Sequence, residues 1–234
     1  MRITMIGHST VLIETDGKKI LTDPYWGKWG NLAYARLGIP AKSRQELREV
    51  DGVLISHDHW DHVDGKYLRL LGDTPVIVPH PTRWIFKLLG GRNVSGIKVW
   101  ESITIGEITI TAVPAVHMTI AMGYVLQSEN KRVYFSGDTF YSHFMHDLGR
   151  KFQLDVALMP VTTYRIPMTM GEKQAVQAVR VLKPAVVMPI HLGIKPRSPL
   201  LRTNQTPEHF AQRLDENGIA TKVVILREGE SYTI

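Results

Sequence analysis

Residues 56–62 read Ser-His-Asp-His-Trp-Asp-His and directly follow a short apolar run. In a segment that leaves a strand, side chains two residues apart project to the same side, so His57, His59 and Asp61 face one way. His62 follows at an expected helix start. Three imidazoles and a carboxylate this close together would otherwise each need a separate hydrogen-bond partner, whereas a divalent cation satisfies them together. The cluster therefore predicts a metal site at the end of a strand.

The chain has no cysteine. This excludes a disulfide framework, a thiolate nucleophile, an iron–sulfur cluster and any zinc site with cysteine ligands. A metal must then be held by nitrogen and oxygen donors, which suit zinc and also manganese or iron. We expect Zn²⁺, with Mn²⁺ or Fe²⁺ as the alternatives.

Length and composition are those of an ordinary folded protein. The 234 residues are 44% hydrophobic and 21% charged, which excludes disordered and fibrous classes and fits one domain over residues 1–234. The first residues lack the layout of a signal peptide, and no run reaches the roughly 20 apolar residues of a membrane span. We therefore expect a cytoplasmic protein without integral membrane contact, and oligomerisation stays open.

The net charge of +6 favours an anionic small-molecule substrate. Lysine and arginine are spread along the chain, and no basic run or RNA-binding signature is visible, so a nucleic-acid partner is not expected. Arg165, Lys195, Arg197 and Arg202 are suited by type to holding a phosphate, a solvated loop being the alternative.

Short apolar runs alternate with segments of helical spacing along most of the chain. Strands are expected at residues 2–6, 11–15, 19–22, 52–55, 76–78, 103–113, 121–127, 132–135, 156–159, 185–188, 222–226 and 231–234, and helices at 63–71, 81–89, 141–148, 173–182 and 206–217. Residues 24–49 and 189–205 are expected to be irregular. The former carry Tyr25, Trp26, Trp29 and Tyr34, which line a pocket or plug the core. Strands flanked by helices on each side predict a layered α/β sandwich.

Three further polar residues end or follow expected strands in a similar way: His117, Asp138 and His191. Residues 53–57 and 186–191 share one layout, an apolar strand, a short turn and a histidine. Because open α/β sheets gather ligands at the carboxyl ends of their strands, these groups are expected to meet at one rim as two half-sites.

Taken with the histidine cluster, this ordered series of motifs resembles the metallo-β-lactamase superfamily over nearly the whole chain. The resemblance implies a four-layer αββα sandwich and a site with two metal ions. It implies one ion on His57, His59 and His117, a second on Asp61, His62 and His191, and Asp138 bridging both. It also implies that Asp23 orients a ligand imidazole through a hydrogen bond.

The segments around His8, Asp23 and Asp138 are similar to those of one branch of that superfamily, which contains N-acylphosphatidylethanolamine-hydrolysing phospholipase D and the ascorbate-6-phosphate lactonases. This similarity implies that His8 lies near the metals, as a contact to the substrate or to a metal ligand. A proton for the leaving group could come from water or from His8. The chain is shorter than the phospholipase and lacks its amino-terminal extension and inserts. The substrate therefore stays open among a phosphodiester, a phospholipid-like ester and a lactone.

Hydrolysis by metal-activated hydroxide is the reaction that such a site implies. Two divalent ions lower the pKa of a bridging water toward about 7, while one ion polarises the carbonyl or phosphoryl oxygen. We expect Asp61, Asp138 and His8 to take part in catalysis. The alternative is a non-hydrolytic metal-binding or redox protein on the same scaffold. Redox relatives usually carry a fused electron-carrier domain and nuclease relatives an inserted domain. The 234 residues leave no room for either, so we expect neither of these functions.

Overall fold

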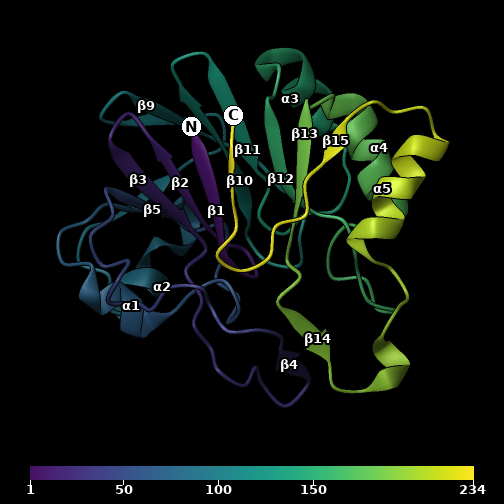
Figure 1. Ribbon diagram of the computed structural model, residues 1–234. Coiled ribbons are helices and arrows are strands. Elements are labelled where there is room, and N and C mark those ends of the chain that lie inside the picture. Colours follow the sequence, from purple (N-terminus) through teal and green to yellow (C-terminus); the bar gives the residue numbers. More distant parts are fainter.

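Two seven-stranded sheets packed face to face form the centre of the computed structural model, which describes residues 1–234 (Figure 1). In spatial order the first sheet consists of β16 (Ser231–Thr233), β1 (Arg2–Gly7), β2 (Thr10–Thr15), β3 (Lys18–Thr22), β5 (Gly52–Leu54), β6 (Val76–Pro79) and β7 (Val94–Ile97). The second consists of β15 (Lys222–Val223), β13 (Val186–Ile190), β12 (Val156–Pro160), β11 (Lys131–Phe135), β10 (Met122–Ser128), β9 (Ile108–Pro114) and β8 (Ser102–Ile105).

Helices cover the outer face of each sheet. α1 (Gly65–Leu70) and α2 (Arg83–Leu88) cover the first, while α3 (Phe144–Phe152), α4 (Glu172–Leu182) and α5 (Pro207–Glu216) cover the second. Two single 3₁₀ turns, His80–Thr82 and Pro199–Leu201, complete the helical elements. None of these helices combines the length and apolarity needed to cross a bilayer.

The alternation of side chains along β5 shows how the layers are held. Leu54 belongs to the core between the two sheets, whereas its neighbour Val53 packs outward with Tyr67 and Phe86 of the covering helices. Successive side chains of a strand point to opposite faces, so a strand covered on both faces is apolar throughout. The predicted four-layer αββα sandwich is confirmed.

Strand direction brings several carboxyl ends to one rim. β3, β5, β6 and β7 are parallel, and in the second sheet β11, β12 and β13 are parallel. β9 runs in the same direction as β11, because each pairs antiparallel with β10 between them. At the rim the two sheets are joined by a hydrogen bond from Met122 N to Ser56 O of 3.0 Å. Loops that follow β3, β5, β9, β11 and β13 therefore meet there.

The structure differs from the sequence prediction in its shortest elements. β4 (Tyr34–Arg36) and β14 (Ile194–Pro196) form a separate two-stranded sheet in stretches that we expected to be irregular. β7 also escaped prediction, since its four residues include a glycine. The expected strand at 103–113 is wrong, because Gly106 has φ +58° and turns the chain between β8 and β9. The strand expected at 222–226 ends at Val223.

Candidate metal centre

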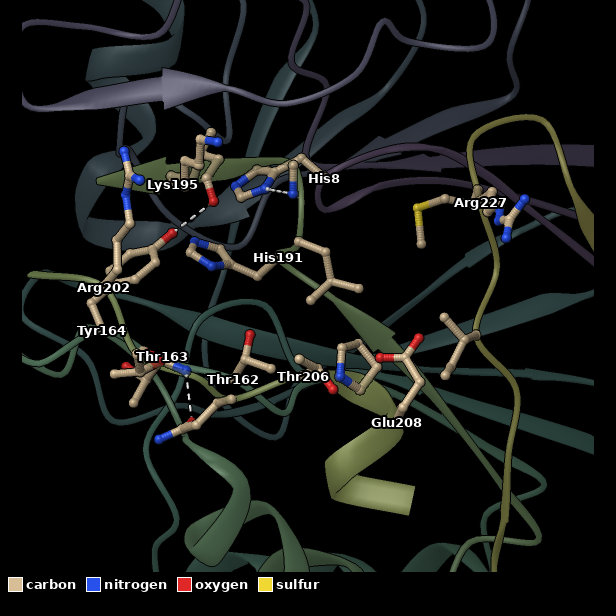
Figure 2. Close-up of a pocket in the computed structure, with 18 of the residues that line it drawn as sticks. His8, Thr162, Thr163, Tyr164, His191, Lys195, Arg202, Thr206, Glu208 and Arg227 are labelled. Atoms are coloured by element: carbon tan, nitrogen blue, oxygen red, sulfur yellow. Dashed lines mark hydrogen bonds between the residues drawn. The ribbon is translucent and has the colours of Figure 1, made fainter. Parts of the chain in front are cut away.

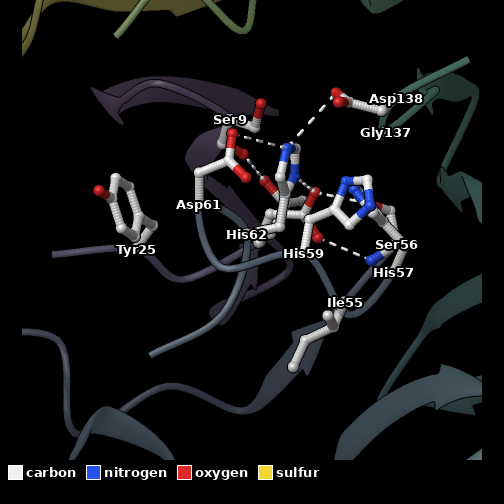
Figure 3. A network of polar contacts seen from close by, with 12 residues as sticks. Ser9, Tyr25, Ile55, Ser56, His57, His59, Asp61, His62, Gly137 and Asp138 are labelled. Atoms are coloured by element: carbon white, nitrogen blue, oxygen red, sulfur yellow. Dashed lines mark hydrogen bonds and ion pairs between the residues drawn. The ribbon is translucent and has the colours of Figure 1, made fainter. Parts of the chain in front are cut away.

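The seven residues expected to bind metal stand in loops that follow four strands. His57, His59, Asp61 and His62 follow β5, His117 follows β9, Asp138 follows β11, and His191 follows β13. Figure 3 shows the cluster after β5 facing Asp138, which comes from the opposite sheet. The structure thus brings all seven side chains to one place.

The potential ligand atoms form two groups with a carboxylate between them. His57, His59 and His117 place ligand atoms within 4.8 Å of one another, and so do His8, Asp61, His62 and His191. Asp138 Oδ1 lies 3.5 Å from His62 Nε2, and its Oδ2 lies 3.1 Å from His191 Nε2. The same Oδ2 is 3.9 Å from Nε2 of His117. One carboxylate therefore contacts both groups.

Several of these atoms are buried without a hydrogen-bond partner. They are His57 Nε2, His62 Nε2, His117 Nδ1 and Asp138 Oδ1. A buried lone pair that accepts nothing is costly, and most buried polar atoms in folded proteins are paired. Imidazole nitrogens and carboxylate oxygens are the donors that zinc, manganese and iron accept. The residues present fit divalent metal ions.

Asp23 fixes the orientation of two of the histidines. Its Oδ2 accepts hydrogen bonds of 2.6 Å from His62 Nδ1 and from Ser56 Oγ, and its Oδ1 accepts one of 2.7 Å from Ser56 N. Because the Ser56 hydroxyl donates to Asp23, it accepts the 2.8 Å bond from His57 Nδ1. Both imidazoles therefore carry their proton on Nδ1, which leaves each Nε2 lone pair free for a metal.

His8 lies in the same cluster and is only 2% exposed. Its Nδ1 accepts a 3.0 Å hydrogen bond from Gly193 N, so its proton lies on Nε2 and is donated to Asp61 Oδ2 at 3.2 Å. Burial and the neighbouring His191 lower the pKa of His8 to about 3. The ring is therefore neutral and orients Asp61.

Left-handed backbone is concentrated at this site. His8, Asp23 and His191 have φ values of 61°, 33° and 64°. Such conformations cost an L-residue roughly 1–2 kcal/mol and persist where surrounding contacts impose them. His191 N donates to His8 O at 3.2 Å, and Asp23 N donates to Leu54 O at 2.9 Å. Hydrogen bonds thus hold the strained residues in place.

The carboxylates and imidazoles of the cluster shift one another's pKa values. Burial by itself would lower the pKa of His191, but the Asp138 and Asp61 carboxylates raise it to about 9. Burial would likewise raise the pKa of both carboxyls, and the surrounding imidazoles hold these pKa values well below the usual range. Without metal, imidazolium protons balance the carboxylates. Divalent cations would take over that balance and release protons.

A small cavity opens from the cluster, and we call it the mouth. Its volume is about 140 Å³, and it is lined by Tyr34, His59, Trp60, Asp61, Asp138, Tyr164, Met168, His191 and Ile194. The ring of Tyr34 is centred 5.5 Å from that of Tyr164 and 6.5 Å from that of Trp60. Beyond the expected ligands, the wall is aromatic and apolar and contains no lysine or arginine.

A second cavity of about 560 Å³ borders the cluster from another side (Figure 2). Tyr164, His191 and Ile194 line both cavities, and the Tyr164 hydroxyl donates to Ile194 O at 3.0 Å in the wall between them. Lys195 and Arg202, which we considered for phosphate binding, line this second cavity and not the mouth.

Sequence reasoning missed Ser56, Trp60 and Tyr164 as parts of the site. Trp60 lies inside the histidine cluster, so its position was a usable signal. For the aromatic residues within 24–49 the sequence leaves open whether they line a pocket or plug the core. Tyr34 lines the mouth, whereas Trp26 packs in the core. Nothing in the local sequence around Tyr164 indicates that it meets Tyr34.

Comparison with known proteins gives concordant results. The family profile of the beta-lactamase superfamily domain matches residues 18–192. A UPF0173 metal-dependent hydrolase of Methanopyrus kandleri is 33% identical over 246 residues, which cover 99% of each protein. The structure of Igni18, a metallo hydrolase of Ignicoccus hospitalis, is 25% identical with a TM-score of 0.78, covering 100% of this chain and 98% of that one. An isothiocyanate hydrolase from Delia radicum gut bacteria shares the fold, with a TM-score of 0.83, 20% identity and coverage of 100% and 99%.

Proposed function

Because this chain belongs to the metallo-β-lactamase superfamily, as a metal-dependent hydrolase, we propose that its rim cluster hydrolyses a small-molecule substrate with two divalent ions. The observation that carries the proposal is the set of buried nitrogen and oxygen atoms without hydrogen bonds, gathered on both sides of Asp138. Without a bound cation these atoms would destabilise the fold, since each buried polar atom without a hydrogen bond costs free energy.

In the proposed site, His57, His59 and His117 would hold one ion, and Asp61, His62 and His191 would hold the other. Asp138 would serve both, since its carboxylate contacts His62, His117 and His191. Bound there, zinc as our first choice, or manganese or iron, would acidify a water molecule and polarise the bond to be cleaved.

The residues of the chain contribute position and charge. Asp61 Oδ2 accepts from His8 and also lies 3.6 Å from His191 Nε2 and 3.8 Å from His62 Nε2, so His8 orients the carboxylate oxygen that faces the nitrogens of the second group. Because His8 is buried and neutral, we assign it a positioning role through Asp61, in place of proton donation to the leaving group. Asp138 remains ionised, since the imidazoles around it hold its pKa low.

The side chains that line the mouth indicate which class of substrate it accepts. A phosphodiester keeps a negative charge, which proteins usually meet with arginine or lysine. The mouth offers aromatic and aliphatic side chains instead, from Tyr34, Trp60, Tyr164, Met168 and Ile194. Of the three substrate types compatible with the sequence, we therefore favour a lactone or similar uncharged ester over a phosphodiester or phospholipid-like compound.

Metal removal tests the proposal. We expect the purified protein to hold up to two ions per chain by elemental analysis. Exhaustive chelation should abolish hydrolysis of a lactone and of a p-nitrophenyl ester, and added zinc, manganese or iron should restore it. Bis-p-nitrophenyl phosphate serves as the charged comparison substrate. Full activity in the metal-free protein contradicts the proposal, and metal binding without hydrolysis of any substrate favours the redox alternative.

Trp60→Ala tests the wall of the mouth. Trp60 is 37% exposed and contributes one face of the cavity. Removing this ring should raise KM for an aromatic lactone about tenfold, the effect of losing one buried aromatic contact, while kcat stays within about twofold. Trp100→Ala is the matched control, because Trp100 is 40% exposed and does not line the mouth. Equal KM values for the two variants would exclude Trp60 from substrate binding.

A further inference from the structure

Three segments that are distant in sequence fold against one another beside the mouth. They are residues 27–36, 162–168 and 194–204, and we call them together the basic lobe. β4 pairs with β14 through Tyr34 and Pro196, and Arg165 N donates to Leu201 O at 2.9 Å. Figure 1 shows β4 and β14 lying below the two large sheets, apart from the helices that cover the sandwich.

The basic lobe contains the whole net charge of the protein. Its cationic residues are Lys28, Arg36, Arg165, Lys195, Arg197 and Arg202, and it contains no aspartate or glutamate. Outside the lobe, the remaining 22 lysines and arginines balance the 22 acidic residues. Arg36 is half-buried and the other five side chains are exposed. None of the six forms a salt bridge. Glu208 and Glu228, outside the lobe, line the larger cavity.

Large apolar side chains stand out from the same lobe. Trp29 is 78% exposed, Leu32 99%, Ile166 64% and Leu200 76%. The loop that presents the first two is firmly built, because Asn31 Oδ1 accepts hydrogen bonds of 2.8 Å from both Ala33 N and Tyr34 N. Arg197 donates to the carbonyls of Trp29 and Asn31 at 2.9 Å. Their exposure is therefore a property of the fold.

We propose that the basic lobe docks onto an anionic lipid bilayer, with Trp29 and Leu32 entering the headgroup region and the surrounding cations contacting lipid phosphates. Apolar side chains set among uncompensated lysine and arginine are typical of surfaces that bind this interface. Lys28, Arg165 and Lys195 are exposed and come from three different segments of the lobe, as expected of an extended charged surface.

Two other partners fit these observations less well. A nucleic acid would use the cations and stack on Trp29, but it gives the aliphatic Leu32, Ile166 and Leu200 no favourable contact. A second copy of the chain, joined through this face about a two-fold axis, would place one basic lobe against the other and meet charge repulsion. A bilayer with anionic headgroups satisfies both the apolar and the cationic side chains.

Docking would place the mouth close to the membrane surface, since Tyr34, Tyr164 and Ile194 belong to both. The inference goes beyond the proposed hydrolysis and does not depend on it. Binding is measured on the full, metal-loaded chain without any turnover, so a failed activity assay and a failed binding assay remain separate results.

Vesicle co-sedimentation tests the proposal. The protein should bind vesicles of phosphatidylcholine with phosphatidylglycerol, bind phosphatidylcholine alone much less, and lose binding as salt rises. Trp29→Ser with Leu32→Ser should weaken partitioning at least about tenfold, because two exposed apolar side chains no longer enter the interface. Lys28→Gln and Lys195→Gln should each weaken binding to the anionic vesicles roughly fivefold. Metal content and melting temperature should match those of the parent protein.

A second exposed pair provides the control. Trp84 and Leu88 on α2 are 62% and 77% exposed and lie outside the lobe. Trp84→Ser with Leu88→Ser should leave vesicle binding unchanged. The proposal is overturned by equal binding to neutral and anionic vesicles, or by loss of binding in the α2 pair and not in the lobe pair. Displacement of vesicles by a single-stranded oligonucleotide, or a dimer dissolved by the Trp29 and Leu32 changes, would equally overturn it.

Discussion

Asp138→Ala is expected to lower kcat/KM by at least about a thousandfold and to leave the protein with at most one bound ion per chain. Asp138 lies between the two histidine groups and contacts both, so its loss removes a carboxylate that would serve both ions. A thousandfold loss corresponds to about 4 kcal/mol of transition-state stabilisation, within the several kcal/mol that a metal ion contributes. Elemental analysis and steady-state kinetics on the same preparation provide the measurement.

Asp147→Ala is the appropriate comparison for that variant. Asp147 is an exposed aspartate of α3, paired only with Arg150 on the same helix, and its removal should change neither metal content nor rate. Circular dichroism against chelated wild-type protein distinguishes loss of metal from loss of fold. Two bound ions with undiminished activity in Asp138→Ala would show that the cluster is not the reaction centre.

Asp23→Asn is expected to lower metal affinity about 10–100-fold, the usual cost of losing a partner that orients a metal-bound histidine. The amide nitrogen of asparagine would donate to His62 Nδ1, where the carboxylate now accepts. His62 would then carry its proton on Nε2, the atom required for the metal. Competition with a metal-sensitive dye measures the affinity.

Excess metal distinguishes the weakened metal affinity expected of Asp23→Asn from the lost ligand expected of Asp138→Ala. Because Asp23 acts through His62 and Ser56, saturating zinc should restore much of the activity of Asp23→Asn. The same addition should not rescue Asp138→Ala, which lacks a ligand. Thr22→Ser, which keeps the neighbouring buried hydroxyl, should bind metal like the parent protein. An unchanged metal affinity in Asp23→Asn would show that Asp23 does not orient a metal-binding histidine.

The sequence predicts most of the metal centre because its richest part is contiguous. His57, His59, Asp61 and His62 stand within one loop, so the short segment that leaves the strand brings them close together without reference to the rest of the chain. His117 and His191 are different, since each is a lone histidine after a strand. They are predicted to bind metal only because the order of motifs resembles that of the family. The structure places them beside the cluster.

What the sequence does not reveal depends on pairing between distant segments. The three-residue strands β4 and β14 are too short to show an alternating pattern, and each is stabilised by the other across more than 150 residues of chain. The clustering of positive charge also depends on this pairing of distant segments. Lysines and arginines that are scattered along the sequence gather in the basic lobe only because this pairing brings Lys28 and Lys195 to one side of the molecule.

The proposed ligands come from both sheets, with the cluster after β5 on the first and His117, Asp138 and His191 on the second. An ion held between them cross-links the two halves of the sandwich. Occupancy is thereby linked to unfolding, because a cation that binds only the native state stabilises it by RT ln(1 + [L]/Kd). Melting temperature then ranks zinc, manganese and iron by their affinity for the native centre, and it does so before any substrate has been identified.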